Sequence, residues 1–549
     1  MKNKHSKYFI FYSFIRQFFD KEIKTKLLLS LGVSIVRILL SILWPVLLYK
    51  SIFKDGALNM ETIEYNLPIA IALFGLSQLL AYKQATLNIH INNKISIQTY
   101  LLLSKKLYSL EWLTYKKQKR VYYFDVFVTS FYRVRQGINS VLEIVIPHTI
   151  ISLVMVFFIA YINFHLFILF LVTYILIFVF QWISYKKLGP LTQMFHNSWR
   201  KQDVNISATI DKYNLVKMGR GFDQATSDFK EKTWGFLEDN SAIMKARAKS
   251  RIVNQVTNQI SKITLLVVGG FWVNSGVVSL SEFIFTFFIA SVVQSSISQL
   301  PGGVMSLLDA SASTNKLVDF LNLKSEDKVP SSKHVKVNQI DEIKLRNICF
   351  SYGEENSLLD NIDVQLHKGR IYLLSGKNGS GKTTLSSVLL GLIKPKKGDY
   401  YVNKQKTPWE SVGALRDRFA YINQETILFA GTIEKNITFG HENKQRPVDK
   451  LQTTWLSTLL SKGISNLDKT IFENNEGVSG GEAKKLVLIR ELLHNSELIV
   501  FDEPFNHLDK KSIAILMNQI KELKKDKIIL LISHQTGFEE IADEMIKLD

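Results

Sequence analysis

Six long apolar segments occupy much of the first 310 residues, and they constrain the fold more than any other feature of the chain. Each segment holds close to the ~20 residues that a helix needs to cross the hydrocarbon core of a bilayer. Residues 27–310 are therefore expected to form a six-helix all-α transmembrane domain. The segments are approximately Leu27–Phe53, Leu67–Ile91, Val141–Phe164, His165–Tyr185, Ile263–Leu280 and Phe283–Val304.

The connections between these segments differ in their content of basic residues. Residues 92–140 and 186–254 are rich in Lys and Arg, whereas the alternate connections hold only Lys50 and Lys54 or none. The positive-inside rule then places both termini and the two long connections in the cytoplasm. The formal net charge of +19 mostly reflects this topology, so we do not expect nucleic acid as a partner.

The two cytoplasmic connections are far longer than ordinary loops and contain few Gly or Pro. Helical continuations of the spanning helices are the simplest interpretation, since ~25 further residues extend a helix by ~37 Å. Their tips fall near Tyr115–Phe127 and Asp211–Phe222, where we expect contact with another domain. Between the third and fourth segments, Asn163–His165 leaves room only for a tight turn.

Residues 1–26 are basic and enclose a short apolar run, Tyr8–Ile15. The run is too short to span a bilayer and lacks a small-residue cleavage site, so a cleaved signal peptide is not expected. We expect an amphipathic helix on the inner membrane surface. The lipid bilayer is thus a partner, and the location is the cytoplasmic (inner) membrane, crossed several times.

Polar residues inside the apolar segments are candidate cargo contacts, because burying them in lipid is costly. Arg37 lies well inside the first segment, where its side chain reaches the membrane surface with difficulty. Gln294 and Gln299 belong to a polar stripe of the sixth segment. A water-filled cavity explains these residues, although helix packing alone also explains the serines of the stripe.

The character of the chain changes after residue 310. Residues 311–342 are polar and are expected to form a linker. From residue 343 to 549 the pattern predicts an α/β domain of the P-loop ATPase type. Cys349 is the single cysteine of the chain, so no intrachain disulfide can form.

A glycine-rich sequence between a predicted strand and a predicted helix indicates the chemistry of this domain. Arg370–Leu374 is short and apolar, and Lys382–Leu392 has apolar residues at helical spacing. The spacing G-x-x-x-x-G-K-[ST] between them is that of a loop whose backbone N–H groups and helix N-terminus face phosphates. The candidate nucleotide ligands are Gly376, Asn378, Gly379, Ser380, Gly381, Lys382, Thr383 and Thr384.

Carboxylates and a cation complete the expected chemistry. Lys382 would reach the β- and γ-phosphates, and the Thr383 hydroxyl would bind Mg²⁺. The run Leu498–Asp502 predicts a buried strand; Asp502 would hold Mg²⁺ through water, and Glu503 would polarise the attacking water. ATP and Mg²⁺ are therefore the expected cofactors.

Two further motifs point to the same reaction. Ser479, Gly480 and Gly481 open a predicted helix and offer a second phosphate contact at its N-terminus. The run Ile528–Ile532 predicts a strand that delivers His534 to its carboxyl end, where catalytic groups are expected in a parallel sheet.

The order of these motifs resembles that of the ATP-binding cassette (ABC) exporter family over essentially the whole chain, as a half-transporter with fused membrane and ATPase (nucleotide-binding) domains. The resemblance implies that Tyr352 stacks on adenine and that Gln424 senses Mg²⁺ and the transmembrane helices. It also implies that His534 is the switch histidine and that Leu428–Ile437 belongs to the exporter branch.

In this family the phosphate loop of one subunit and the signature loop of another enclose each ATP. The resemblance places the signature loop at Val478–Glu482 and the dimer-contacting loop at Asp509. Val478 and Glu482 depart from the usual Leu and Gln, Phe505–Leu508 replaces a run of small residues, and the chain lacks the usual C-terminal helices after His534. None of these departures removes a phosphate or metal ligand, so an active ATPase is expected.

ATP-driven export across the cytoplasmic membrane by a homodimer is the leading hypothesis, with Glu503, His534 and Gln424 in catalysis. Arg37 favours a cargo with a carboxylate, such as a bacteriocin-like or signalling peptide. A multidrug or lipid exporter or a flippase is the alternative. A membrane-anchored ATPase without transport is less well supported because one helix would suffice as an anchor, and importers usually place the two halves on separate chains.

Overall fold

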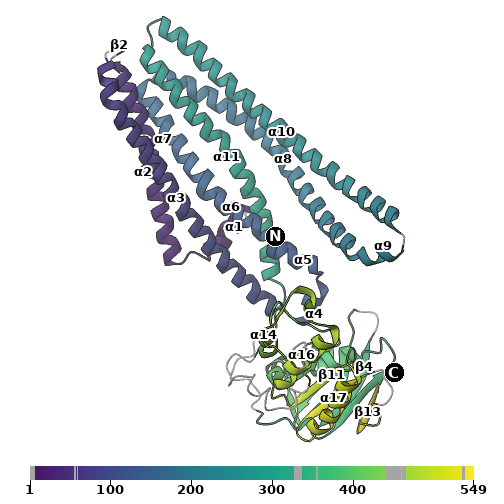
Figure 1. Ribbon diagram of the computed structural model, residues 1–549. Coiled ribbons are helices and arrows are strands. Elements are labelled where there is room, and N and C mark those ends of the chain that lie inside the picture. Colours follow the sequence, from purple (N-terminus) through teal and green to yellow (C-terminus); the bar gives the residue numbers. More distant parts are fainter. Residues whose placement is uncertain are drawn as a thin grey trace. The chain divides into compact units, whose positions relative to one another are not determined.

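The computed structural model describes residues 7–54, 57–58, 60–219, 221–326, 337–353, 357–440, 459, 465–533 and 538–548. The chain divides into two compact units, and each is described by itself (Figure 1). A helical unit comprises Met1–Leu110 and Thr114–Lys324. An α/β unit comprises Ser325–Asp549 and takes in the short segment Glu111–Leu113.

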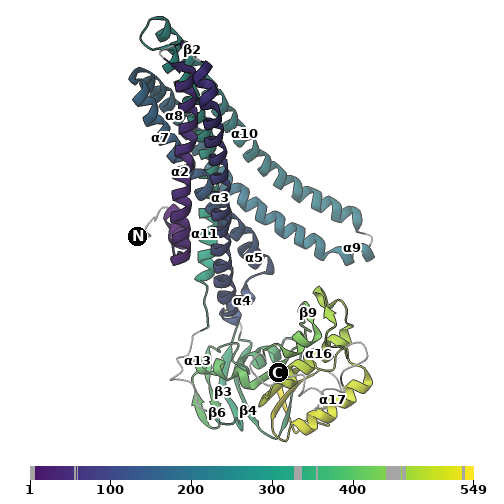
Figure 2. The same cartoon turned by 60° about the vertical axis from the view of Figure 1, so that its left-hand side comes forward.

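The helical unit consists of long helices that run beside one another. In both Figure 1 and Figure 2, α2 lies along α3, and α8 lies along α10 as the two lead to α9. Its elements are α1 (Lys7–Arg16), α2 (Lys21–Ile52), β1 (Phe53–Lys54), β2 (Ala57–Leu58), α3 (Met60–Tyr108), α4 (Trp112–Lys117, whose first two residues belong to the α/β unit), α5 (Arg120–Phe124), the π-helix η1 (Asp125–Ser130), α6 (Phe131–Ser140), the π-helix η2 (Val141–Val145), α7 (Ile146–Ile162), α8 (Phe164–Asp211), α9 (Tyr213–Gly219), α10 (Phe222–Asn274) and α11 (Leu280–Leu321).

Four helical stretches of the described chain are long and apolar enough to cross a membrane: Lys21–Leu47, Thr62–Tyr108, Arg120–Ile162 and Leu280–Leu321. They correspond to the first, second, third and sixth predicted segments. The start of α8, Phe164–Ile175, is apolar but shorter. The expected count of six is thus not reproduced among the described residues.

The fifth predicted segment, Ile263–Leu280, was wrong in its boundary. α10 ends at Asn274, and Gly276 follows with φ +73°, a backbone conformation that favours glycine. α11 begins at Leu280 after Ser279. The apolar residues Val277 and Val278 continue the hydrophobic run across this turn, so hydropathy alone does not reveal the break.

The predicted helical continuations are confirmed. α3, α8 and α10 contain 49, 48 and 53 residues, which at ~1.5 Å per residue makes each more than ~70 Å long. The hydrocarbon core of a bilayer is only ~30 Å thick. Each helix therefore extends well beyond the length that a bilayer can cover.

The tight turn predicted between the third and fourth segments is confirmed at Asn163. α7 ends at Ile162, and Asn163 in an extended conformation caps α8. Its side-chain oxygen accepts hydrogen bonds from the backbone N–H groups of His165 (3.0 Å) and Leu166 (3.3 Å). One residue thus satisfies two donors at the start of a 48-residue helix.

The N-terminal amphipathic helix forms, but its apolar face does not lie against lipid as we expected. Phe11, Phe14 and Ile15 are buried in the core of the helical unit, where they join residues of α3, α6 and α11 such as Ile91 and Leu317. An amphipathic pattern shows that a face is apolar without showing what covers it. Here the covering surface is protein.

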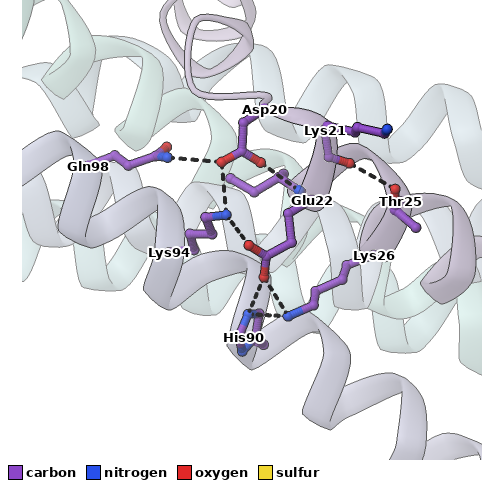
Figure 3. A network of polar contacts seen from close by, with 9 residues as sticks. Asp20, Lys21, Glu22, Thr25, Lys26, His90, Lys94 and Gln98 are labelled. Carbon is purple, nitrogen blue, oxygen red and sulfur yellow. Dashed lines mark hydrogen bonds and ion pairs between the residues drawn. The ribbon is translucent and has the colours of Figure 1, made fainter.

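A polar network joins the start of α2 to α3, as Figure 3 shows. Glu22 accepts from Lys26 (2.8 Å) and is also paired with His90 and Lys94, while Asp20 pairs with Lys94 at 2.8 Å. These side chains are between 26% and 51% exposed, so the individual pairs contribute little to stability. Together they lie at the start of α2, where the charged residues Lys21–Lys26 precede the apolar part of the helix.

The first part of the expected linker is helical. α11 continues to Leu321, and Ser311, Ser313 and Thr314 are buried within the helical unit. Small hydroxyl residues resemble a linker in sequence, yet they also allow helices to pack closely. Residues 327–336 of the expected linker lie outside the described residues.

The α/β unit is built on a parallel five-stranded sheet and an antiparallel four-stranded one. The parallel sheet has the order β13-β5-β12-β11-β8 and the antiparallel sheet the order β4-β3-β6-β7. The strands are β3 (Glu342–Phe350), β4 (Leu359–His367), β5 (Ile371–Gly376), β6 (Lys397–Val402), β7 (Gln405–Thr407), β8 (Phe419–Ile422), β9 (Gly431–Thr432), β10 (Thr470–Ile471), β11 (Leu498–Asp502), β12 (Ile528–Ile532) and β13 (Glu544–Leu548). The helices include α12 (Lys382–Leu389), α13 (Trp409–Val412), α14 (Ile433–Thr438), α16 (Gly480–Leu493) and α17 (Lys510–Leu523).

The parallel sheet is buried on both faces, which explains its continuous apolar strands. Tyr372 and Leu374 of β5 belong to one core, and Ile371 and Leu373 belong to the core on the opposite face. Trp112, from the short segment that joins this unit, packs against the first core. The sheet thus provides a rigid base for the loops at the carboxyl ends of its strands.

Candidate nucleotide-binding site

The glycine loop joins β5 to α12 with the geometry that phosphate binding requires. Gly379 and Gly381 have φ values of +85° and +94°, and Gly381 caps α12. A Cβ on Gly376 would lie 2.4 Å from the carbonyl oxygen of Leu548, so a side chain cannot be accommodated there. The loop therefore presents bare backbone at the N-terminus of a helix.

A cavity of about 640 Å³ opens in front of this loop. It gathers most of the residues that the sequence singled out. Its lining includes Asn378, Gly379, Gly381, Lys382, Thr383, Thr384, Gln424, Asp502 and Glu503, together with Leu358, Asn506 and Ile532.

Two predicted loop residues, Gly376 and Ser380, do not line the cavity. Ser380 Oγ is buried, and the described part of the chain offers it no hydrogen-bond partner. Lys382 Nζ donates to the carbonyl oxygens of Gly376 (2.7 Å) and Lys377 (2.8 Å). The ammonium group thus lies over the loop, where a phosphate oxygen could replace a carbonyl as its acceptor.

The two carboxylates follow one another at the carboxyl end of β11. Asp502 accepts a hydrogen bond from the Tyr421 hydroxyl (3.1 Å), and burial raises the pKa of Asp502. Glu503 has φ +46°, and its backbone N–H donates to Ile532 of the adjacent strand (2.9 Å). This hydrogen bond helps to hold a strained backbone that turns the Glu503 side chain toward the cavity.

The residues that surround the cavity fit Mg²⁺ bound together with phosphates. Thr383, Gln424 and Asp502 supply a hydroxyl, an amide and a carboxylate oxygen to one space. Mg²⁺ prefers oxygen ligands and is commonly held by one or two carboxylates, water and substrate phosphates. Within the described residues, no group of three or more His, Cys, Asp or Glu could hold a metal by protein alone.

Tyr352 lies beside the glycine loop without lining the cavity. Its hydroxyl is 3.1 Å from Thr384 Oγ1, and its ring packs edge to face on Phe350 with centroids 5.0 Å apart. The side chain is 63% exposed. An exposed aromatic face next to the phosphate loop can stack on a planar base.

The signature loop forms a capping box at the start of α16. Ser479 Oγ accepts from the Glu482 N–H (3.3 Å), and Glu482 accepts from the Ser479 N–H (2.8 Å). Lys485, on the same helix, pairs with Asp509 at 2.7 Å, and the bond to Lys485 is the main cause that lowers the pKa of Asp509. Ser479, Gly480 and Gly481 are absent from the lining of the glycine-loop cavity.

Two residues complete the comparison with the expected site. His534 lies outside the described residues. Lys484, which sequence reasoning missed, is fully buried and donates to the carbonyl oxygen of Asn423 (2.8 Å), directly before Gln424. Glu482 and Lys485 beside it are also charged, so the local sequence gives no signal that could have revealed Lys484.

Among the polar residues of the membrane segments, Arg37 of α2 and Gln299 of α11 converge on His148 of α7. The Gln299 side chain lies within reach of His148, and Arg37 acts on His148 electrostatically, while His148 Nδ1 has no hydrogen-bond partner in the described part of the chain. Arg37 Nε is buried and has no hydrogen-bond partner in the described part of the chain. Gln294 is directed elsewhere, since its Nε2 donates to Ser261 of α10 (3.1 Å).

Comparison with known proteins gives a consistent result. The family model described as ABC transporter matches residues 359–506. A probable ABC transporter ATP-binding/permease protein of Haemophilus influenzae is 26% identical over 56% of this chain and 56% of its own length. The energy-coupling factor transporter ATP-binding protein EcfA1 of Mycoplasmopsis synoviae is 30% identical over 37% of this chain and 78% of its own length.

A subtilin transport ATP-binding protein of Bacillus subtilis is 25% identical over 57% of this chain and 52% of its own length. EcfA1 apart, the chain thus spans about half the length of these curated relatives. A bacterial Atm1-family ABC exporter solved with ATP bound has the same fold, with a TM-score of 0.82 and 14% identity over 96% of this chain and 94% of that one.

Proposed function

The chain belongs to the ABC transporter family, and on that premise we propose that it is an exporter driven by ATP hydrolysis. The proposal is carried by one observation: a single chain combines helices able to cross a membrane with a cavity that gathers a phosphate loop, a lysine and two carboxylates. An ATPase that is merely anchored would need one apolar helix.

The residues around the cavity divide the work of hydrolysis in this proposal. Lys382 exchanges a loop carbonyl for a phosphate oxygen, and the backbone N–H groups at the start of α12 bind the others. Thr383, Gln424 and Asp502 would hold Mg²⁺, which when bound neutralises charge on the β- and γ-phosphates. Glu503 orients a water molecule and accepts its proton as the oxygen attacks the γ-phosphorus and the bond to ADP breaks.

Other residues are assigned to the same reaction on their motifs and positions. Tyr352 is proposed to stack on adenine, and Asn378, Gly379, Ser380, Gly381 and Thr384 to complete the phosphate cradle. His534 is assigned to the γ-phosphate through its place after β12. Both termini and the ATPase domain are proposed to lie in the cytoplasm, on the basic side of the inner membrane.

The active form is proposed to be a homodimer. Ser479, Gly480 and Gly481 open a helix suited to phosphate binding but do not belong to the lining of the cavity in their own chain. A second copy could bring this helix to the nucleotide. Because the described part of the chain contains every ATP-site group that we named except His534, two identical copies would form two equivalent sites.

The cargo is proposed to be a peptide with a carboxylate. The half-buried Arg37, whose Nε atom is buried and which acts electrostatically on His148, favours an anionic group within the membrane half. Gln294 and Gln299 support it less directly. One relative is named for subtilin transport and another is named an ATP-dependent lipid A-core flippase, so a lipid or drug exporter fits the same fold.

The test is transport into inside-out vesicles that contain the purified full chain. We expect ATP-dependent uptake of candidate peptides, lost in Lys382→Ala, which cannot bind the phosphates, and in Glu503→Gln, which binds ATP but hydrolyses it at least about 100-fold more slowly. Lys377→Ala is the matched control, because this exposed lysine contributes a backbone carbonyl. Uptake by Glu503→Gln at the wild-type rate would refute the proposal.

A further inference from the structure

One buried charge near the nucleotide site has no part in the reaction described so far. Lys484 lies on α16, five residues after Ser479, and none of its surface is exposed. Charged lysines are almost never fully buried unless they are paired, because the ammonium group loses its hydration. A specific compensation is therefore required.

The surroundings of Lys484 supply two kinds of compensation. Its Nζ donates to the carbonyl oxygen of Asn423 at 2.8 Å. Asp502 and Glu503 act on it electrostatically, and their effect opposes the lowering of the Lys484 pKa that burial causes. The ammonium group thus lies within the electrostatic influence of the two carboxylates that line the cavity.

The hydrogen bond reaches the loop that follows β8. Asn423 follows β8 and precedes Gln424, whose side chain lines the cavity. Tyr421, two residues earlier, donates to Asp502. Lys484 therefore connects α16 to the residue that follows β8, and Tyr421 connects β8 to the end of β11.

We propose that Lys484 is a positioning residue of the nucleotide site, which fixes the backbone before Gln424 and offsets part of the negative charge of Asp502 and Glu503. The inference rests on the proposed ATP hydrolysis and adds a residue to it. Its two actions can be separated. The hydrogen bond sets the place of Gln424, and the positive charge lowers the affinity of the carboxylates for a cation.

Two substitutions separate these actions. Lys484→Met keeps the length of the side chain but removes both the charge and the donor. Lys484→Gln removes the charge and keeps an N–H donor for Asn423. Both remove the cost of burying an ion, but Lys484→Met also takes a donor away from the Asn423 carbonyl oxygen, so thermal unfolding of each variant is measured beside its activity. Lys521→Gln, at an exposed position of α17, is the control for the change in net charge.

The first measurement is nucleotide affinity of the full chain in lipid nanodiscs, with Mg²⁺ and with EDTA. In both Lys484 variants the ratio of the two affinities should rise at least about threefold, since removal of a nearby positive charge strengthens cation binding. A lysine with only a packing role would leave the ratio unchanged. An unchanged or lower ratio in both variants, with Lys521→Gln at the wild-type value, would overturn the charge-offsetting role.

The second measurement is steady-state hydrolysis. Lys484→Met should lower kcat about tenfold without raising KM for ATP, because Gln424 is displaced while the phosphate loop is intact. Lys484→Gln should recover most of the rate. Equal rates in Lys484→Met and wild type would refute the positioning role, whereas absence of hydrolysis in the wild type would instead refute the proposed function.

Discussion

Two helices of this protein, one in each unit, begin with the same capping box. α11 follows Ser279 with Glu282 three residues later, and α16 follows Ser479 with Glu482 three residues later. In both, the serine accepts from the glutamate N–H and the glutamate accepts from the serine N–H. The local chemistry of the two helix starts is therefore the same.

The residues inside the two boxes differ. Leu280 and Ser281 occupy the first turn of α11, whereas Gly480 and Gly481 occupy that of α16. A Cβ on Gly481 would meet the carbonyl oxygen of His507 at 2.7 Å, but a Cβ on Gly480 would meet nothing within 4 Å. The described contacts within the chain thus explain the glycine at position 481 but not the glycine at position 480.

The largest expected effect comes from Gly480→Ala. We expect ATP hydrolysis to fall more than about tenfold, because a methyl group would keep a phosphate held by a second copy from the helix N-terminus. The midpoint of thermal unfolding should stay the same, since the space in the chain is open. Leu280→Ala at the same position of α11 should leave hydrolysis intact. Normal hydrolysis in Gly480→Ala would contradict the idea that the capping box of α16, unlike that of α11, takes part in ATP hydrolysis.

Removing the serine should separate stability from activity. Ser279→Ala and Ser479→Ala each lose an N-cap and should lower the free energy of unfolding by about 1 kcal/mol. Only Ser479→Ala should also reduce hydrolysis, by severalfold. Denaturant unfolding and ATPase assays on both variants test this; equal ATPase losses would mean that the effect comes from capping alone.

A smaller effect is expected from Glu482→Gln. The Glu482 carboxylate accepts from Ser479 Oγ at 2.9 Å, so its negative charge lies at the helix end where a phosphate would bind. Neutralising it should lower KM for ATP about twofold, and the difference should shrink at high salt because salt screens exposed charges. Glu282→Gln should leave KM unchanged. A salt-independent or higher KM in Glu482→Gln would contradict this reasoning.

The smallest expected effect is confined to the helical unit. Asn163 caps α8 and its side chain also donates to Glu282 (3.3 Å). Asn163→Ala should lower the free energy of unfolding by about 1 kcal/mol, with no change in ATP hydrolysis. Asn163→Ser keeps a capping oxygen without placing a second carboxylate beside Glu282, and it should recover most of the loss. Measurement of thermal unfolding in nanodiscs would show whether the capping interaction is responsible.

Features that depend on local sequence, like the two capping boxes, could be predicted from sequence. The glycine loop and the strand that ends at Asp502 were recognisable because phosphate binding demands particular residues at fixed spacing. The turn at Asn163 was recognisable because three polar or bulky residues had to connect two apolar segments. In each case the local sequence nearly determines the local structure.

Other features depended on contacts between distant segments. Ser311 and Thr314 were expected in a linker, but they belong to α11 and are buried. Phe14 was expected to face lipid, but other residues of the protein cover it. Lys484 is buried and hydrogen-bonded to Asn423 only because α16 packs against β8. No pattern within one segment reports which other segment will cover it.

The length of α8 and α10 has a mechanical consequence. Each is one unbroken helix of 48 or 53 residues, and the two are joined by α9 (Figure 2). A rod of ~70 Å that tilts by about 5° at one end moves its other end by about 6 Å, which is roughly one helical turn. Small adjustments among side chains at one end of this pair would therefore arrive at the other as a displacement large enough to break and remake whole contacts.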